Sequence, residues 1–274
     1  MDFKGKTVVI TGGSEGVGGA TAQAFADAGA NLMLAARTRK NLEEVAEELR
    51  DKTRVEIFAM DVADTVACSD LLKKAQFEFG SVHVLVNNAG YHQRGPILTV
   101  DSGDLAAMID VNLRGPIVLS RLAIPMIKEA GEGAIINVAS LAGRTPVPGA
   151  ATYSASKFGM RAFTFALAEE LRDTNIKVAA VSPGPIDTGF IMANIDNVTD
   201  LTFSQPISTA EEVAQEVLNL CSNRKLERSM PPLSGLLTMA TYLWPAIGRV
   251  MRPLLEKKGR RVKRKLKVQR LAGK

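Results

Sequence analysis

A glycine-rich segment between an apolar run and a helix-like stretch constrains this chain more than any other feature. Residues 7–11, TVVIT, form a short β-branched run that is typical of a buried parallel strand. The segment TGGSEGVG, residues 11–18, follows it. Glycine permits a tight turn and a close approach of the backbone to a pyrophosphate, which a helix N-terminus can bind. The segment predicts a nucleotide site at Gly12, Gly16 and Gly18, and a plain strand-to-helix turn is the alternative.

Further apolar runs alternate with helical stretches along the chain. Strands are expected at 31–36, 55–60, 82–86, 133–139 and 176–182, with a weak seventh at 226–230. Helices are expected after the glycine segment and at 39–50, 65–79, 101–130 and 151–172. The helix over 101–130 is expected to bend near Gly115 and Pro116, and 187–208 to form a loop or lid. The alternation predicts an α/β fold: a Rossmann-like doubly wound parallel sheet of six or seven strands with helices on both faces.

The end of the second expected strand indicates which dinucleotide would bind. Dinucleotide folds often carry an acidic residue there, which binds the ribose 2′-hydroxyl. This chain instead has Ala36 and Arg37, with Arg39 and Lys40 beyond. A guanidinium binds a phosphate in bidentate fashion, so we expect NADP(H) in preference to NAD(H). A solvated basic helix start is the alternative, and Glu15 in the glycine segment counts against a phosphate there.

A tyrosine and a lysine four residues apart form the candidate catalytic pair. Tyr153 and Lys157 lie in YSASK, within an expected helix, so their side chains share one helix face. A free tyrosine has a pKa of about 10, and a nearby ammonium lowers that value by stabilising the phenolate. Ser140 ends the fifth expected strand, at the carboxyl edge where open α/β sheets bind ligands. Its hydroxyl can hold a substrate oxygen beside that of Tyr153.

The few cysteines and histidines exclude several other chemistries. Cys68 and Cys221 are far apart, so neither a disulfide framework nor a zinc spacing is present. His83 and His92 do not form a ligand pair, and we expect neither a metal site nor a Ser-His-Asp triad. The N-terminus has no apolar signal region followed by a cleavage site, which favours the cytoplasm with reduced thiols.

Taken together, these motifs resemble the short-chain dehydrogenase/reductase family over about residues 5–225. TGGSEGVG resembles the family's TGxxxGxG segment, and NNAG at residues 87–90 matches its strand-four motif. Asp61-Val62 resembles the adenine-contacting pair, and Asn112 in VNLRG matches the helix asparagine. Ser140, Tyr153 and Lys157 match the rest of a catalytic tetrad. Pro183-Gly184, followed by Ile186 and Thr188, resembles the loop that holds the nicotinamide carboxamide.

The resemblance implies a reaction and a set of site residues. Tyr153 would donate a proton to a carbonyl oxygen while the cofactor delivers hydride to its carbon. Lys157 would lower the pKa of Tyr153 and bind the nicotinamide ribose, Asn112 would hold a water, and Ser140 would orient the carbonyl. The family also pairs commonly through its two long helices, which implies a homodimer or homotetramer. The implied cofactor-binding residues are Gly12, Ser14, Gly16, Val17, Gly18, Arg37, Asp61, Val62, Asn88, Ala89, Gly90, Tyr153, Lys157, Pro183, Gly184, Ile186 and Thr188.

The C-terminal part departs from the family pattern. We expect one dinucleotide-binding and catalytic domain over 1–230 and an amphipathic helical extension with a basic tail over 231–274. The chain has a formal net charge of +5; residues 256–274 hold ten Lys or Arg and one Glu, which leaves −4 for the rest. An apolar stripe at helical spacing precedes this tail. Its members are Leu236, Ala240, Leu243, Ile247, Val250 and Leu254.

Two interpretations of the extension stay open, and they are compatible. An apolar helix face followed by cations suits an anionic membrane surface, with Tyr242 and Trp244 at headgroup level. The apolar run is too short to span a bilayer, and Pro245 and Pro253 interrupt it. Alternatively, a helix pair covers the substrate cleft. The protein is thus expected in the cytoplasm, either free or peripheral on the inner face of the membrane, and a nucleic-acid partner is disfavoured because base-reading aromatics are missing.

The segments near the expected cleft predict an apolar substrate. The segment 141–152 carries little charge apart from Arg144, and the lid adds Phe190, Ile191, Met192 and Ile195. We therefore expect an NADPH-dependent reductase of a hydrophobic ketone or aldehyde. The alternatives are an NAD-dependent alcohol dehydrogenase and a membrane-associated cofactor-binding sensor or scaffold.

Overall fold

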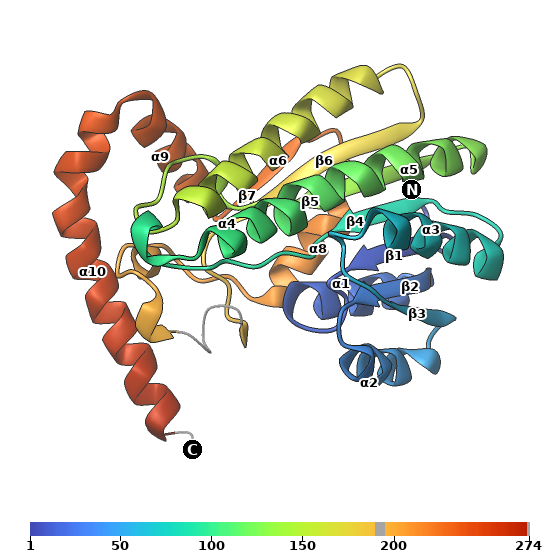
Figure 1. The fold of residues 1–274 in the computed structure, drawn as a ribbon, viewed down its shortest axis with the longest axis horizontal. Helices are drawn as coiled ribbons and strands as arrows, with labels where there is room; N and C mark the ends of the chain where they lie inside the picture. The colour runs from blue at the N-terminus through green and yellow to red at the C-terminus, as the bar shows by residue number, and fades with distance from the viewer. Residues whose placement is uncertain (190–194, 273–274) are drawn as a thin grey trace.

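Seven parallel strands form one sheet in the computed structural model, which describes residues 1–189 and 195–272 (Figure 1). The strand order is β3-β2-β1-β4-β5-β6-β7, so the chain reverses its direction of winding between β1 and β4. The predicted Rossmann-like fold is confirmed, with the weak seventh strand included. The strands are β1 (Thr7–Thr11), β2 (Asn31–Ala36), β3 (Val55–Ala59), β4 (Val84–Asn87), β5 (Gly133–Val138), β6 (Ile176–Pro183) and β7 (Glu227–Met230).

Helices cover both faces of the sheet. Successive strand residues point to opposite sides, so each face presents apolar side chains to the helices that pack on it. Val8 and Ile10 of β1 pack with one core layer, while Val9 packs with the other. The first layer includes side chains of α1 (Gly16–Asp27), α2 (Arg39–Arg50) and α8 (Ala210–Leu220). The second includes side chains of α3 (Thr65–Phe79), α5 (Gly115–Glu129) and α6 (Ala151–Glu170).

The helix expected over 101–130 is continuous but changes its winding in the middle. It comprises α4 (Ser102–Ile109), a π-helical turn at Asp110–Arg114 and α5. The irregularity thus lies just before the expected bend at Gly115. Gly115 packs against the loop after β3, where a Cβ atom would come within 2.4 Å of the Val62 carbonyl oxygen. The π-helical turn contains Asn112, and such turns are frequent at functional sites.

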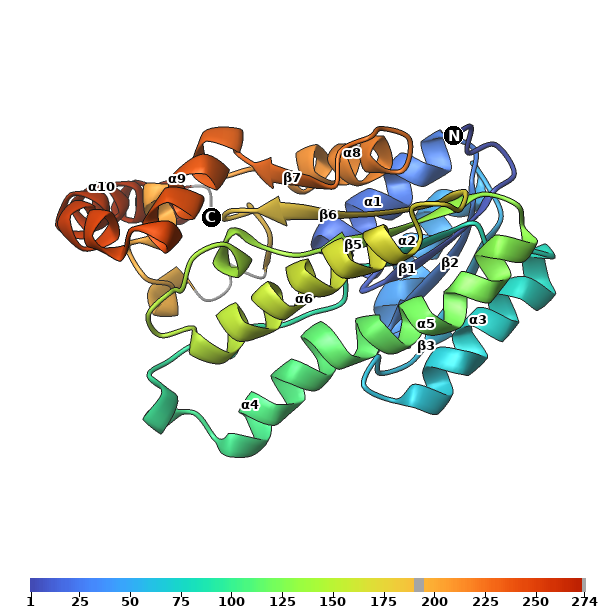
Figure 2. The ribbon, with the colours of Figure 1, turned by 90° about the horizontal axis from the view of Figure 1, so that it is seen from above.

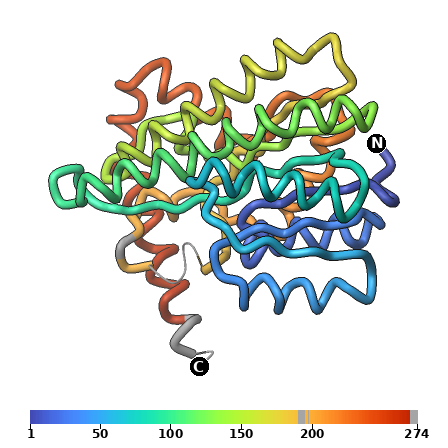
Figure 3. Tube along the Cα trace, turned by 45° about the vertical axis from the view of Figure 1, so that its right-hand side comes forward, coloured from blue at the N-terminus to red at the C-terminus, as the bar shows by residue number. Residues whose placement is uncertain are grey.

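The C-terminal extension lies at the carboxyl end of the sheet. The arrows of β6 and β7 point toward it, and α9 (Pro232–Leu243) and α10 (Pro245–Ala272) lie beyond them (Figure 2). Pro245 starts α10, whereas Pro253 lies within it and does not end it. The tube view shows α10 running down one side of the molecule to the C-terminus (Figure 3). Among the described residues, no helix combines the length and apolarity that crossing a bilayer requires.

The segment expected as a loop or lid is irregular where it is described. It contains short 3₁₀ turns at Ile195–Asn197 and Thr202–Ser204, and Ile186 forms a bridge with Ser208. Three of the lid residues, Phe190, Ile191 and Met192, lie outside the described residues. Ile195 packs with Phe203 and against α10. It does not line the cleft described below, which corrects the expectation for this residue.

Candidate active site

A cleft of about 740 Å³ opens at the carboxyl ends of the strands, between β1 and β4, where the strand order reverses. Open α/β sheets bind ligands at this position. Its walls come from the β1–α1 turn, the ends of β2 through β6, the start of α6 and the inner side of α9 and α10. Predicted residues that line it are Gly12, Ser14, Gly16, Val17, Arg37, Asp61, Val62, Asn88, Ala89, Gly90, Ser140, Tyr153, Lys157, Pro183, Gly184, Ile186 and Thr188.

The glycine turn has no room for a side chain at Gly12 or Gly18. Gly12 has a φ of 65°, and a Cβ atom there would lie 2.8 Å from the Asn88 amide nitrogen. Gly18 does not line the cleft; it packs so closely that a Cβ atom would lie 1.9 Å from the Gly12 carbonyl oxygen. Each glycine therefore serves close packing at the turn. The close approach of backbone segments leaves the N-terminus of α1 facing the cleft.

The NNAG motif is tied to the glycine turn by side-chain hydrogen bonds. The Asn88 amide donates to the carbonyl oxygens of Thr11 and Gly12, at 2.9 and 3.1 Å. The Thr11 hydroxyl accepts from the backbone N–H groups of Asn88 and Ala89, both at 3.1 Å. These bonds join the ends of β1 and β4, which are 77 residues apart in sequence. They fix the two loops that form the floor of the cleft.

The cleft fits a dinucleotide on the evidence of its own atoms. The first turn of α1 contains no acidic residue, and its N-cap residue Glu15 makes no side-chain capping bond. The N–H groups and the positive end of the helix dipole are thus available to a pyrophosphate. Arg37 lines the cleft beyond the end of β2, as predicted, while Arg39 and Lys40 do not. Glu15 also lines the cleft.

Tyr153 has an imidazole ring and an ammonium group close to it. The rings of Tyr153 and His92 stack, with centroids 4.1 Å apart and an interplanar angle of 11°. The Lys157 Nζ atom lies 5.8 Å from the centre of the Tyr153 ring and donates a hydrogen bond of 2.9 Å to the Val138 carbonyl oxygen. Both members of the predicted pair therefore face the same cleft. The stacked imidazole limits the movement of the phenol ring.

Burial sets the ionisation of these groups. It raises the pKa of Tyr153, against the opposing effects of a hydrogen bond with Ser140 and the charge of Arg94. The expected lowering of this pKa by Lys157 is thus not found. Burial lowers the pKa of Lys157 to about 8 and that of His92 to about 3. At neutral pH the phenol is therefore protonated, the amine mostly charged and the imidazole neutral.

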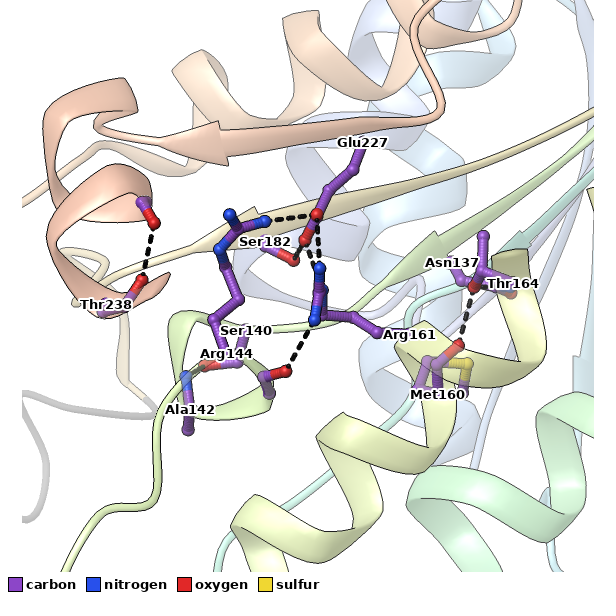
Figure 4. Close-up of polar contacts among 12 residues, drawn as sticks. Asn137, Ser140, Ala142, Arg144, Met160, Arg161, Thr164, Ser182, Glu227 and Thr238 are labelled. Carbon is purple, nitrogen blue, oxygen red and sulfur yellow. Dashed lines mark hydrogen bonds and ion pairs between the residues drawn. The ribbon is translucent and has the colours of Figure 1, made fainter. Parts of the chain in front are cut away.

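Ser140 begins the loop after β5 and stabilises it. Its hydroxyl accepts from the Ala142 N–H group at 3.1 Å and donates to the Pro183 carbonyl oxygen at 3.5 Å. Arg144, the only charged residue noted in this loop, points away from the cleft to Glu227 of β7 (Figure 4). The loop therefore contributes an uncharged wall to the cleft.

Glu227 joins three elements around it. Its carboxylate accepts hydrogen bonds from Arg144, Arg161 of α6 and Ser182 of β6, the last at 2.6 Å (Figure 4). Burial raises the pKa of Glu227, but the hydrogen bonds from Arg161, Ser182 and Arg144 outweigh it and hold the pKa below its ordinary value. The cluster ties β7, and hence the start of the extension, to the Ser140–Arg144 loop.

Asn112 lies behind the cleft and does not line it. Its side chain is fully buried. The amide exchanges two hydrogen bonds of 2.9 Å with the backbone N–H and carbonyl of Tyr91 and donates a third to the Ser156 hydroxyl at 3.3 Å. Asn112 therefore positions the segment after NNAG, which carries His92.

The extension covers the cleft from one side. Thr238 and Thr241 of α9 and Arg249 and Arg252 of α10 line it, and none of them belongs to the predicted apolar stripe. The Thr241 hydroxyl lies 3.3 Å from that of Thr145 in the loop after β5. The interpretation as a cleft-covering helix pair agrees with this geometry.

The cysteines are far from this chemistry. Cys68 and Cys221 are both buried and unpaired with each other. Burial raises the pKa of Cys68 to about 11 and that of Cys221 to about 12. Within residues 1–189 and 195–272, no group of three or more His, Cys, Asp or Glu side chains is arranged to hold a metal ion.

Three residues around the cleft were not foreseen from the sequence. His92 stacks on Tyr153, Arg94 lines the cleft, and Glu227 holds its outer loop. His92 and Arg94 follow NNAG directly, so their closeness to that motif was a usable signal. Glu227 offered no such signal, because its partners come from segments 45, 66 and 83 residues away.

Comparison with known proteins shows what this chain resembles. A family model described as short chain dehydrogenase matches residues 6–198. Sulfoacetaldehyde reductase 2 of Chromohalobacter salexigens is 39% identical over 187 residues, which are 68% of this chain and 74% of that protein. An NADP-dependent 3-hydroxy acid dehydrogenase of Schizosaccharomyces pombe is 33% identical over 232 residues, 81% of this chain and 88% of that protein.

Solved structures show the same similarity. A short chain dehydrogenase/reductase from Burkholderia phymatum, crystallised in complex with NAD, matches with a TM-score of 0.79 and 26% identity. The match covers 87% of this chain and 93% of that one.

Proposed function

This chain is a member of the short chain dehydrogenase family, and on that premise we propose that it is an NADPH-dependent reductase of a hydrophobic carbonyl compound. As an oxidoreductase of this family it interconverts a hydroxyl and a carbonyl group with a nicotinamide cofactor. The proposal adds the preferred cofactor, the direction and the substrate class. The observation that carries it is the grouping of Tyr153, Lys157 and Ser140 in one cleft with the glycine turn.

Tyr153 is the proposed proton donor. Since burial raises its pKa, the phenol stays protonated near neutral pH and has a proton to give. A substrate carbonyl oxygen near its hydroxyl and that of Ser140 would receive this proton as the carbonyl carbon gains hydride. The nicotinamide cofactor supplies that hydride when bound.

Lys157 and His92 control how the phenol reacts. The Lys157 ammonium lies 5.8 Å from the centre of the phenol ring, where it would bind the nicotinamide ribose, as the family resemblance implies, without lowering the pKa of Tyr153. A neutral imidazole stacked on the phenol adds no charge that would oppose the ammonium. Asn112 keeps the segment that carries His92 in place through its bonds to Tyr91. We propose His92 and Asn112 as positioning residues.

Arg37 supports the preference for NADPH. It lines the cleft at the end of β2, where the sequence has Ala36 and Arg37 in place of an acidic residue that would repel a 2′-phosphate. The related protein from Schizosaccharomyces pombe is by name NADP-dependent, whereas the Burkholderia phymatum structure contains NAD. Glu15 in the cleft favours NAD and makes an NAD-dependent alcohol dehydrogenase the second candidate.

The substrate part of the cleft supports an apolar compound. Leu141, Val147 and Leu237 line it, and the nearby Arg144 is engaged by Glu227. One observation favours a different substrate class: Arg94 lines the cleft, and its charge acts on Tyr153. The related reductases are named for sulfoacetaldehyde and a 3-hydroxy acid, so a carbonyl compound with an anionic group is the second candidate.

A cofactor-binding measurement with a carbonyl panel tests the proposal. Kd values for NADPH and NADH are measured on the full chain, and NADPH oxidation is then followed with apolar and with anionic ketones and aldehydes. We expect at least tenfold tighter binding of NADPH and turnover of apolar carbonyls. Equal affinities would remove the argument from Arg37, and turnover of anionic carbonyls alone would move the substrate to the second class. No turnover at all with tight cofactor binding would favour the sensor or scaffold.

We also propose a homodimer or homotetramer in the cytoplasm. The helices α4 and α5 run end to end alongside α6 on one face of the molecule, which supports pairing through these helices (Figure 2). Sedimentation equilibrium of the purified chain tests this assembly, and a monomer at micromolar concentration would contradict it.

A further inference from the structure

The helices α9 and α10 turn large apolar side chains to the outside of the molecule. Leu233, Val250 and Leu254 are 81%, 81% and 70% exposed. Helices that pack on a protein core bury such side chains instead. Within the described residues, residues 233–254 hold more than half of the exposed large apolar side chains. These are Leu233, Leu236, Tyr242, Leu243, Trp244, Ile247, Val250 and Leu254.

Along α10 the outward row changes from apolar to cationic. Residues three or four apart share one helix face, so one row runs along the whole helix. Its first half is apolar and its second half is basic, and all six side chains are exposed. We call these residues the outward row: Ile247, Val250, Leu254, Lys258, Arg261 and Lys265.

The opposite face of α10 fixes this orientation. Gly259 packs against the loop before Thr202–Ser204, where a Cβ atom would lie 1.7 Å from the Asp200 carbonyl oxygen. Val262 and Leu266 pack against Phe203, and Arg260 pairs with Asp200 at 3.0 Å. The outward row therefore points to solvent because the inner face is already occupied.

We propose that the outward row, together with Leu233, Leu236, Leu243 and Trp244, docks onto an anionic membrane surface. Apolar side chains enter the headgroup region while cations contact lipid phosphates, and Trp244 suits headgroup depth. No described helix is able to cross the bilayer, so α10 would lie on the surface. A second copy of the chain fits poorly, because a symmetric contact brings together two segments of +9 charge.

Docking would place the cleft close to lipid. The inner face of the same helices lines the cleft through Thr241, Gly248 and Arg252. One helix with its side chains is about 10 Å thick, so the cleft mouth lies about that far from the headgroups. The docking does not depend on the proposed reaction, since it involves none of the residues proposed for proton transfer.

Vesicle binding tests the docking. The full-length protein is sedimented with vesicles of phosphatidylcholine alone and with vesicles containing phosphatidylglycerol. We expect at least tenfold stronger partitioning onto the anionic vesicles, and a loss of binding as salt rises. Equal binding to both vesicles, or none to either, would overturn the proposal.

Variants of the outward row separate its two halves. Val250→Ser with Leu254→Ser, and separately Arg261→Glu with Lys265→Glu, should each weaken binding to anionic vesicles about tenfold or more. Each pair needs a control of the same kind elsewhere on the surface. Leu98→Ser, at a side chain that is 95% exposed outside the extension, and Lys225→Glu should leave binding unchanged.

The outcomes are decisive because folding and turnover are read separately. Circular dichroism checks that each variant is folded, and cofactor binding checks the cleft. Unchanged vesicle binding in folded outward-row variants would overturn the proposal. The proposal would also be overturned if the protein bound no vesicles and replacing Leu254 reduced its self-association. That result would identify a second copy of the chain as the partner that covers the outward row. Failure of the proposed reductase function would instead appear as absent turnover with intact vesicle binding.

Discussion

The helices α8 and α10 are both amphipathic, yet they orient their apolar faces in opposite ways. α8 buries Val213, Val217 and Leu220 in the core layer that it shares with α1 and α2. α10 exposes Val250 and Leu254, while Val262 and Leu266 in its second half pack against the body. An apolar stripe thus identifies the side of a helix that is poorly suited to water. It does not identify what covers that side.

The core domain and the C-terminal extension have different functions. The sheet with α1 to α8 places the glycine turn, Tyr153 and Lys157 around one cleft, and strands β1 to β6 contribute buried side chains to its support. The extension adds one wall of the cleft and an outer surface that the core does not need. Changes in the core should therefore act on chemistry or folding, and changes on the outward row on neither.

The largest expected effect tests the chemistry of the core. Tyr153→Phe keeps the ring and its stacking on His92 but removes the proton donor. We expect kcat for carbonyl reduction to fall about 10²- to 10⁴-fold, the range of general acid catalysis, while the Kd for NADPH changes less than threefold. Steady-state kinetics and fluorescence titration measure the two quantities. A kcat within tenfold of the unmodified protein would remove Tyr153 from the proposed mechanism.

The second effect tests the joint between core and extension. Glu227→Gln removes the negative charge beside Arg144 and Arg161, whose side chains are each only 12% exposed. Breaking a buried ion pair from one side costs about 3 kcal/mol or more, so the free energy of unfolding should fall by about that amount in chemical denaturation. The matched control is Glu169→Gln, at an exposed pair with Arg172, which should change it by less than about 1 kcal/mol.

Acid should remove the difference between Glu227→Gln and the unmodified protein. The folded state holds the pKa of Glu227 below its ordinary value. The stabilisation is therefore complete above the ordinary Glu range, near about pH 4.3, and is lost as the pH falls through the lower folded value. The two unfolding free energies should converge in that window. A constant difference down to the lowest measurable pH would contradict the charge-based account.

The third effect tests cofactor choice. Arg37→Ala removes the guanidinium at the end of β2 and leaves the glycine turn unchanged. We expect the Kd for NADPH to rise about 10- to 100-fold, the equivalent of one or two charge-assisted hydrogen bonds, with little change for NADH. Isothermal titration measures both values. Arg39→Ala, which alters a neighbouring cation outside the cleft, is the control and should change neither.

The fourth effect is a pH dependence in the same cleft. Burial lowers the pKa of Lys157 to about 8, so its ammonium is lost as the pH rises past that value. The kcat/KM for carbonyl reduction should therefore fall by up to tenfold per pH unit above about pH 8. Unfolding would not explain the fall, since a lowered folded pKa makes the stability rise with pH in this window. Lys157→Met should be slower and show no step near pH 8.

The sequence was sufficient to predict cleft residues whose position depends only on where the strands end. Gly12, Ser140 and Arg37 follow or end strands, and strand boundaries were predicted to within two residues. Because parallel strands end at one edge, such residues meet in the cleft without any knowledge of side-chain contacts. The same reasoning brings Tyr153 there, at the start of α6.

Features that depend on contacts between distant segments were not predicted. The direction of Arg144 is decided by Glu227, 83 residues away, and the pKa of Tyr153 by how deeply the ring is buried. Ile195 faces α10 and not the cleft, because its neighbours Val198 and Phe203 form a small separate core with that helix. Periodicity gave the stripe on the extension but not its outward orientation.

The smallest expected effect is the sharpest test of the comparison between α8 and α10. Leu254→Ser replaces a side chain that is 70% exposed, and surface changes of this kind shift stability by no more than about 0.5 kcal/mol. Leu220→Ser, at a fully buried leucine of α8, should cost about 3 kcal/mol or more, since it leaves a cavity and buries a hydroxyl. Urea denaturation of both variants without lipid measures the pair. If Leu254→Ser destabilised the protein as much as Leu220→Ser, α10 would pack its outward row against the protein in solution, and this row would be unavailable to a membrane.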